Sequence, residues 1–331
     1  MLVTARNTKK QTHPCCKEGV RARTQEQRTQ WDQSKRLEPL FRRAYYNLAR
    51  NMISGDMEKA INRAVRIPNA TPEIMLAAMP FFNPDDPDTF AVWNRFAEKL
   101  QDAYKKVIAL SVQTEMRRRG WSKKIDRAEI VQKVRVPKRV PSVPVNPASL
   151  EFMRTRSLRL AVELSSQTRE VVTDILSEAF EEAIHPTQIV KKIKASVGLT
   201  RHMQQMVKRR VDAMTAGGFK QVAIDKEREK YSDQLRKRRA ETIARTETLD
   251  AQTVGLKETW AKAKDEGLIP PGAKKVWDSV IDERVSDVCL ELDGQEVGIA
   301  EQFNSDIVGP LDRPPAHPNC RSTMRLKFPK E

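Results

Sequence analysis

Two cysteines and one histidine near the C-terminal end of the sequence have the residue types of a metal site. His317 and Cys320 are separated by two residues, and Cys289 lies 28 positions before His317. Thiolates and imidazoles are ligands that zinc prefers, usually four of them in a tetrahedral arrangement. This set lacks a fourth ligand, and Asp282, Asp287 or a water molecule is a candidate to complete it. The sequence therefore raises the hypothesis of a zinc site.

Two other interpretations of the same segment stay open. Three protein ligands and one water are typical of a catalytic zinc site, and Asp282, Glu283 and His317 around a divalent ion would activate water in a nuclease. Alternatively, His317 and Asn319 form hydrogen bonds within their loop, and the cysteines pack as small apolar side chains. Ser286 stands where a Cys-x-x-Cys pair would have its first thiol. No second acidic cluster, glycine-rich phosphate loop or serine-elbow motif accompanies these residues, so we expect no enzyme.

Residues 267–331 are expected to form the small α+β module that positions these side chains. The alternating pattern of residues 276–281 predicts a strand. Residues 290–297 predict a β-hairpin with Asp293-Gly294 at its turn, because a two-residue hairpin turn requires the positive φ that glycine readily adopts. Trp277 is expected in the core of the module, docked on the helix that precedes it.

That preceding helix is predicted over residues 219–266, either as one long helix or as two with a bend. Glu247 lies among alanines on one face of its second half, where another element can approach closely. A buried carboxylate needs a partner, because an unpaired buried charge is costly. We expect Arg284 or Arg321 to form a bidentate pair with Glu247.

The rest of the chain predicts a mainly α fold, with two helical parts that precede the module and its β-hairpin. Apolar residues at steps of three and four indicate the helices, and prolines between them indicate a linker. The expected helices cover residues 38–65 with a break at Gly55, 71–79, 88–119, 149–184, 188–197 and 201–216. The expected domains are a flexible basic arm (1–36), an N-terminal helical domain (37–120), a basic proline-rich linker (121–147) and a C-terminal domain (148–331, with helices to 266).

Several motifs of the C-terminal domain occur in an order that carries a resemblance. They are Arg245-Thr246-Glu247-Thr248, Trp277, Asp282-Glu283-Arg284-Val285, Leu292-Asp293-Gly294-Gln295 and His317-Pro318-Asn319-Cys320-Arg321. In this order they resemble the C-terminal module of the phage head-morphogenesis family, the minor head proteins similar to phage Mu protein F. Ser322 stands where some relatives carry another cysteine. Structural or docking roles are expected for Arg245, Glu247, Trp277, Arg284, Asp293, Gly294, Asn319 and Arg321.

The resemblance implies a non-catalytic minor head protein of the virion or prohead. Its expected partners are the portal protein and the major capsid or scaffold protein, and its expected place is the head interior or the portal vertex. Assembly would take place in the host cytoplasm. Alternatives from other classes are a metal-dependent nuclease and a general nucleic-acid-binding protein outside any virion.

The positive charge of the chain is concentrated in two regions. The net charge is +16, and residues 1–50 and 101–145 each hold 12 lysines and arginines against 4 acidic residues. Such clusters favour binding to a polyanion, here packaged double-stranded DNA, because neutralised phosphates release counterions. A solvated surface is the simpler alternative. The candidate DNA-binding residues are Arg21, Arg23, Arg117, Arg118, Arg119, Lys123, Lys124, Lys138 and Arg139.

The sequence gives no reason to expect a membrane or a disulfide framework. It has no run of about eighteen apolar residues and no apolar signal-peptide core near its beginning. The remaining two cysteines, Cys15 and Cys16, are adjacent, and a bridge between neighbours is strained. Two free thiols in a reducing cytosol are the expected state.

Overall fold

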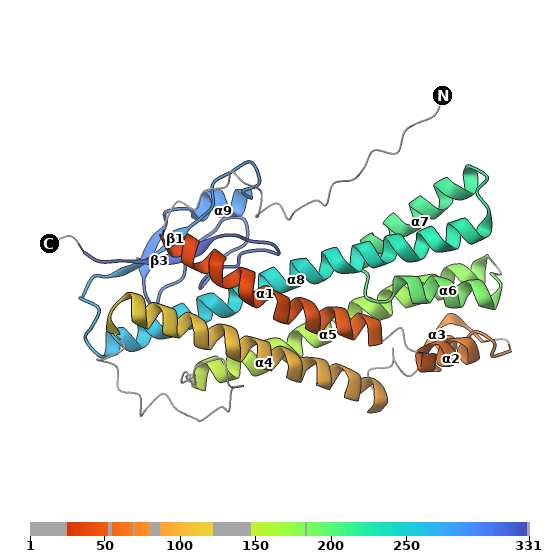
Figure 1. The fold of residues 1–331 in the computed structure, drawn as a ribbon, viewed down its shortest axis with the longest axis horizontal. Helices are drawn as coiled ribbons and strands as arrows, with labels where there is room; N and C mark the ends of the chain where they lie inside the picture. The colour runs from red at the N-terminus through yellow and green to blue at the C-terminus, as the bar shows by residue number, and fades with distance from the viewer. Residues whose placement is uncertain are drawn as a thin grey trace.

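The computed structural model describes residues 25–51, 55–68, 70–79, 87–121, 147–182 and 184–329. In these residues a bundle of helices carries a small three-stranded sheet at one end (Figure 1). The mainly α fold with a C-terminal α+β module is therefore confirmed. Within the same ranges, no helix combines the length and the apolar character that crossing a membrane requires.

The first two helices are α1 (Gln25–Asn51) and α2 (Gly55–Ala64). Helix α1 begins well before residue 38, so the assignment of residues 25–36 to a flexible arm was wrong. The physical reason is a tertiary contact. The side chain of Gln27 is fully buried, and its Nε2 donates at 3.2 Å to both Asp278 Oδ1 and the Ser279 carbonyl. The apolar periodicity of a helix gives no sign of such a polar anchor.

The next helices are α3 (Pro72–Ala77) and α4 (Pro87–Arg118), as predicted. The hydroxyl of Thr71 accepts the Ile74 N–H at 3.4 Å, and proline at the first helical position needs no N–H partner. Helix α4 ends in basic residues and is followed by Gly120 at φ 71°, a left-handed conformation that glycine adopts without strain.

The second group of helices comprises α5 (Pro147–Glu181), α6 (Pro186–Ser196), α7 (Arg201–Ala216) and α8 (Gln221–Asp265). The sequence left open whether this last segment forms one long helix or two with a bend. The structure shows that α8 is one continuous helix of 45 residues. It runs along the whole bundle, with α7 beside its first half and the sheet module beside its second half (Figure 1).

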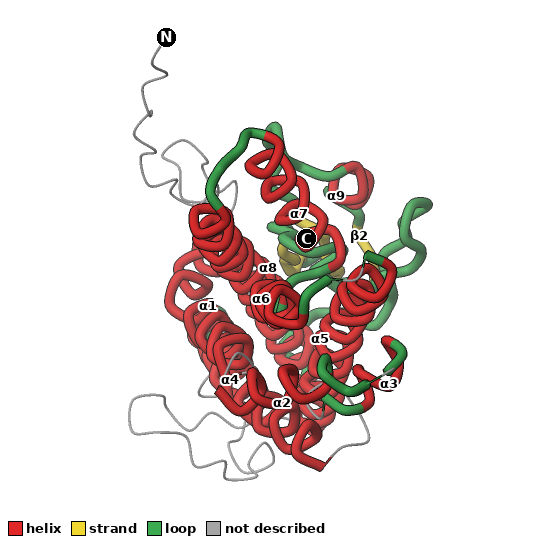
Figure 2. The backbone as a smooth tube through the Cα atoms, turned by 90° about the vertical axis from the view of Figure 1, so that its right-hand side faces the viewer, coloured by secondary structure: helices red, strands yellow, loops and turns green. Residues whose placement is uncertain are grey.

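One apolar core joins the two predicted helical parts. Helices α1, α4, α5 and α8 pack against one another, as the view nearly along the bundle in Figure 2 shows. Phe41 of α1 contacts Tyr104 of α4 edge to face at 4.9 Å between ring centroids. Helices α4 and α8 approach so closely that a Cβ on Gly255 would lie 2.9 Å from Ser111 Cβ. Residues 37–120 thus pack directly against the helices that follow residue 147.

The module contains the strands β1 (Lys274–Asp278), β2 (Glu296–Gly298) and β3 (Thr323–Lys327), all antiparallel and in the order β2-β1-β3. The predicted strand at residues 290–292 was wrong, because these residues end the short helix α9 (Asp287–Leu292). Ser286 caps α9 by accepting the Cys289 N–H at 3.2 Å, and a helix start of this kind overrides a short apolar alternation. Gly294 keeps its predicted positive φ of 79°, but the turn leads from α9 into β2.

Two buried tryptophans serve different parts of the module. Trp277 is fully buried and contacts Phe303 edge to face at 5.2 Å between centroids, within a cluster that also contains Leu292. Its predicted place in the module core is therefore confirmed, but its cluster holds no residue of α8. Instead, Trp260 of α8 packs with Met324 of β3 and joins the module to the bundle.

Candidate functional site

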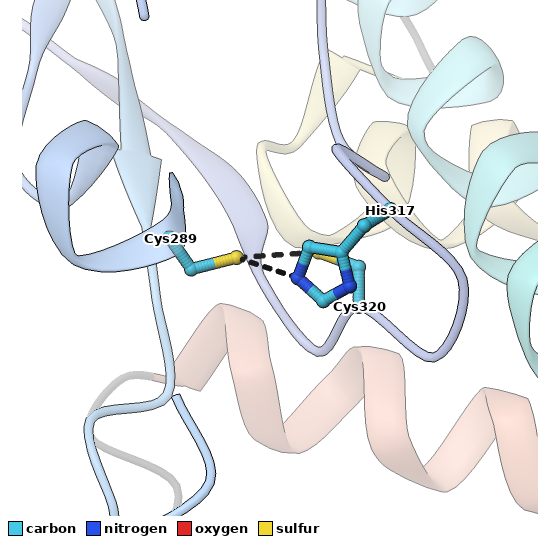
Figure 3. A group of neighbouring side chains, drawn as sticks. All are labelled: Cys289, His317 and Cys320. Carbon is cyan, nitrogen blue, oxygen red and sulfur yellow. Dashed lines mark hydrogen bonds between the residues drawn. The ribbon is translucent and has the colours of Figure 1, made fainter. Parts of the chain in front are cut away.

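Cys289, His317 and Cys320 meet in the module, as Figure 3 shows. Cys289 comes from α9, and the other two come from the loop before β3. The Cys289 sulfur lies 3.2 Å from His317 Nε2 and 3.7 Å from the Cys320 sulfur. Both cysteines are buried, whereas His317 is partly exposed. Three of the four predicted metal ligands are thus neighbours in space, with ligand atoms within 4.8 Å of one another.

Local backbone features place the three side chains. The Cys320 N–H donates to the His317 carbonyl at 3.1 Å and closes a tight turn. Asn319 occupies the left-handed position of this turn at φ 60°, which asparagine tolerates better than most residues. On the opposite side, the cap formed by Ser286 fixes the first turn of α9 and with it the position of Cys289.

Hydrogen bonds set the protonation preferences of the cluster. Hydrogen bonds with Cys320 and then with His317 lower the pKa of the Cys289 thiol, although burial opposes this shift. The pKa of Cys320 is raised by its hydrogen bond with Cys289 and by burial. The pKa of His317 is raised, chiefly by its hydrogen bond with Cys289. Of the two cysteines, Cys289 therefore loses its proton more readily.

Asp282 does not join the cluster, and its prediction as a fourth ligand was wrong. Arg321 binds its carboxylate at two points, with Nη2 2.6 Å from Oδ1, and this pair lowers the pKa of Asp282. Two serines stand beside the cluster instead. Ser286 Oγ lies 2.8 Å from His317 Nε2, and Ser322 Oγ lies 3.2 Å from the Cys289 sulfur.

Glu247 is buried in the bundle and is held by an arginine that the sequence did not indicate. Arg156 of α5 donates from Nε to Oε2 at 2.9 Å and from Nη2 to Oε1 at 2.6 Å. The hydroxyl of Tyr104 donates to the same carboxylate. The predicted pairing with Arg284 or Arg321 was therefore wrong: Arg321 binds Asp282, and Arg284 is exposed.

Burial and the neighbouring charges shift the pKa values of Arg156 and Tyr104. Burial lowers the pKa of Arg156, but the hydrogen bond and charge of Glu247 outweigh it and raise the pKa. Burial and the negative charge of Glu247 raise the pKa of Tyr104 well above its usual value. No spacing rule connects residues 91 positions apart on different helices, so the sequence could not identify Arg156 as the partner.

The loop that carries His317 and Cys320 lies directly on α8. The Asn319 N–H donates to Thr246 Oγ1 at 3.1 Å, and its side-chain amide donates to Thr242 Oγ1 at 3.2 Å. Arg245 Nη1 donates to Asn319 Oδ1 at 3.3 Å. The structure thus brings together two of the predicted docking residues, Arg245 and Asn319.

Further contacts along α8, which sequence reasoning missed, extend this docking. Arg313 donates to Asp250 Oδ1 at 2.8 Å, and the Thr253 hydroxyl donates to the Pro314 carbonyl at 2.6 Å. Lys257 pairs with Asp312 at 2.7 Å. The contacts of the loop with α8 therefore extend from Thr242 to Lys257, over about four turns of the helix.

Comparisons with known proteins found one family that matches part of the chain. Residues 171–325 match the family model described as Phage Mu protein F like protein. This Mu F-like region runs from α5 to β3 and contains all three residues of the thiol and imidazole cluster. The match confirms, for this part of the chain, the resemblance seen in the sequence. The searches of curated proteins and of solved structures found no match.

Within the Mu F-like region, two more predicted residues hold the turn after α9. Asp293 Oδ1 accepts the Ser279 N–H at 2.8 Å, and the Gly294 N–H donates to the Trp277 carbonyl at 2.9 Å. These bonds join the turn to β1 and the residue after it. Asp293 and Gly294 therefore connect α9, which carries Cys289, to the sheet.

The predicted DNA-binding residues that the structure describes differ in their exposure and in their partners. Arg118 and Arg119 both bind Glu115, at 2.9 and 3.1 Å from their Nε atoms, and Glu115 also accepts the Trp260 indole N–H at 2.8 Å. These two arginines therefore stabilise the junction near the module, while Arg117 is exposed. The other candidates lie outside the described residues: Arg21, Arg23, Lys123, Lys124, Lys138 and Arg139.

Proposed function

We propose that the protein is a non-catalytic component of a phage virion or prohead that acts in head assembly or DNA delivery. In this function it binds the portal, major capsid or scaffold protein and holds it in position. The observation that carries the proposal is the Mu F-like match over residues 171–325. The fixed docking of the module on α8 supports it, because a rigidly held module offers a partner a defined surface.

The use of the acidic residues favours binding over turnover. Arginines neutralise three carboxylates that a metal-dependent hydrolase would need as ligands or bases. Asp282 pairs with Arg321, Glu247 with Arg156, and Asp250 with Arg313. In each pair the arginine links two elements of the fold, so these carboxylates support the structure.

Three exposed apolar side chains on the module are the proposed contact with the head protein. Leu290, Ile307 and Val308 are 47%, 56% and 46% exposed. Glu291 accepts a hydrogen bond from Ser305 Oγ at 2.6 Å and holds the loop with Ile307 and Val308 beside α9. Apolar side chains on an ordered surface, surrounded by polar ones, are typical of protein interaction sites.

Head incorporation tests this assignment. Leu290→Asp combined with Ile307→Asp places two charges on the contact surface and should strongly reduce the amount of protein in purified heads. Val222→Asp is the matched control, because Val222 is 80% exposed but lies at the other end of α8. The measurement is quantitative immunoblotting of heads assembled with each variant. Metal-dependent DNA cleavage by the wild type that Asp282→Ala abolishes would contradict the proposal.

We assign DNA binding to the basic segments that flank α1 and α5. Residues 1–24 hold six lysines and arginines against one acidic residue, and residues 122–146 hold seven against two. Because α1 begins at Gln25, removal of residues 1–23 leaves the helix complete. The truncated protein should bind double-stranded DNA more weakly than the full chain, with a smaller salt dependence. Binding by the full chain that does not change with salt would contradict this assignment.

A further inference from the structure

Two of the distances between ligand atoms in the cluster of Cys289, His317 and Cys320 are close to those of a tetrahedral zinc site. Zinc–sulfur bonds of about 2.3 Å place two thiolate sulfurs about 3.8 Å apart across a tetrahedral angle. The two sulfurs in the structure are 3.7 Å apart. A sulfur and an imidazole nitrogen on the same ion lie about 3.5 Å apart, and the Cys289 sulfur lies 3.2 Å from His317 Nε2. These two separations match a zinc site to within a few tenths of an ångström, and all three ligand atoms lie within 4.8 Å of one another.

The hydrogen bond on the other side of His317 prepares the ring for a metal. His317 Nδ1 lies 2.8 Å from the Pro318 carbonyl oxygen. A carbonyl oxygen only accepts, so Nδ1 carries a hydrogen, and in the neutral ring Nε2 has the free electron pair. Histidine ligands in metal sites are commonly oriented by a bond of this kind from the second nitrogen. Nε2 is also the nitrogen that faces Cys289.

The surroundings of the sulfurs favour a bound cation as well. Both cysteines are buried, and the structure has them as free thiols. The Cys289 sulfur accepts a hydrogen bond from Ser322 Oγ at 3.2 Å. His317 is partly exposed, so an ion and a water molecule can reach the cluster from its side.

We propose that Cys289, His317 and Cys320 bind one zinc ion, with a water molecule in the fourth position. Ser286 Oγ lies beside this position, 2.8 Å from His317 Nε2, and would bind that water. The ion would link α9 to the loop that Asn319 anchors on α8. Its role is to stabilise the module in its docked position, a property that goes beyond the proposed binding of head proteins.

Cobalt(II) titration of the full-length protein tests the proposal directly. The protein is stripped with a chelator under anaerobic, reducing conditions and then titrated with cobalt(II), which reports thiolate ligands by near-ultraviolet charge-transfer bands. The bands should saturate at about one cobalt ion per chain, and added zinc should then displace the cobalt. The absence of thiolate bands in the wild type would overturn the proposal, whatever the effect of any mutation on folding.

Two matched variants assign the ligands. Cys289→Ser with Cys320→Ser should lose the bands and the zinc detected by elemental analysis. Cys15→Ser with Cys16→Ser removes the same number of thiols, the only other cysteines of the chain, and should keep both signals. Retention of the bands in the first variant, or their loss in the second, would overturn the assignment. This readout is independent of head incorporation, so either proposal can fail without the other.

Discussion

Arg156 donates two hydrogen bonds, 2.9 and 2.6 Å long, to the carboxylate of Glu247 inside the bundle. With Tyr104 as a third partner, the contact joins α4, α5 and α8. Glu247 is only 2% exposed, so its charge is compensated by these partners and little by water. The pair therefore ties a residue outside the matched family region, Arg156, to a residue within it, Glu247.

Removal of either partner of this pair should destabilise the protein severely. Glu247→Ala leaves the hydroxyl of Tyr104 without its acceptor and the guanidinium of Arg156 with only Asp250, 3.7 Å from its Nε. Breaking a buried ion pair costs about 3–5 kcal/mol. Arg156→Ala should cost a similar amount, and the double variant should lose less than the sum of the two. The measurement is the free energy of unfolding in urea, followed by circular dichroism.

The control for this prediction is an exposed pair on the same helix. Arg159 pairs with Glu163 at 3.1 Å, with side chains 71% and 42% exposed. Arg159→Ala should change the free energy of unfolding by about 0.5 kcal/mol or less, because exposed pairs of this spacing contribute little. If Arg156→Ala and Arg159→Ala lowered the free energy of unfolding equally, the buried pair of Arg156 and Glu247 would contribute no more to stability than an exposed one.

Asn319 has two separate tasks, and two substitutions distinguish them. Asn319→Gly keeps the positive φ of 60° accessible but removes the side-chain bonds to Thr242 and Arg245. Asn319→Ala removes the same bonds and also strains the backbone, so it should destabilise the module by about 1 kcal/mol more. Hydrogen exchange of residues 312–321 measures the effect, and both variants should exchange faster than the wild type. Equal exchange in the glycine and alanine variants would show that the left-handed conformation costs nothing here.

The ion pair of Asp282 with Arg321 should make part of the stability of the module dependent on pH. Its hydrogen bonds to Arg321 lower the pKa of Asp282 below its value in the unfolded chain. A lowered folded-state pKa contributes stability above the unfolded pKa, and this contribution is lost as the pH falls through the folded value. Asp282→Asn should therefore lower the melting temperature at pH 7, and the difference from wild type should shrink as the pH falls below about 3.9, the usual pKa of an aspartate.

The exposed neighbour Glu283 provides the control for the pH prediction. Glu283→Gln changes the charge of the chain by the same amount, next to Asp282. It should change the melting temperature much less at pH 7. A difference between Asp282→Asn and wild type that does not shrink at any pH below about 3.9 would contradict the proposed linkage.

Sequence patterns predicted those parts of the structure that depend on local spacing. Helices α4 and α7 follow from apolar periodicity and clear end signals, and the cluster of Cys289, His317 and Cys320 follows from residue types with metal-ligand chemistry. The errors concern contacts between distant positions. Nothing near Gln27 shows that it bonds with Asp278, and nothing near Glu247 indicates Arg156.

The wrong prediction of a strand at residues 290–292, which belong to α9, has a different cause. A helix of six residues is too short for its apolar spacing to differ clearly from that of a strand. The cap formed by Ser286 decides the conformation. In the sequence, Ser286 stood out only as the position where a Cys-x-x-Cys pair would have its first thiol. The partner of Asp282 was missed for a similar reason, since acidic residues near a candidate metal site suggest ligands as readily as ion pairs.

Ser286→Cys offers the sharpest prediction about the fourth position of the proposed zinc site. Because Ser286 Oγ lies 2.8 Å from His317 Nε2, a thiol there would stand beside the ion and complete a set of three cysteines and one histidine. Zinc affinity, measured by competition with a chromophoric chelator, should rise by about tenfold or more. The metal-free variant should be less stable by about 1 kcal/mol, because the substitution removes the cap of α9.

Asp287→Cys is the control for this gain, since it adds a thiol one position away on an exposed site of the same helix. Its zinc affinity should equal that of the wild type. A gain in both variants would indicate nonspecific thiol binding, and a gain in neither would place the open coordination position away from Ser286. A gain in Ser286→Cys alone would show that the fourth position faces the start of α9. Binding by the wild type would then use two cysteines, one histidine and a water molecule held by the Ser286 hydroxyl.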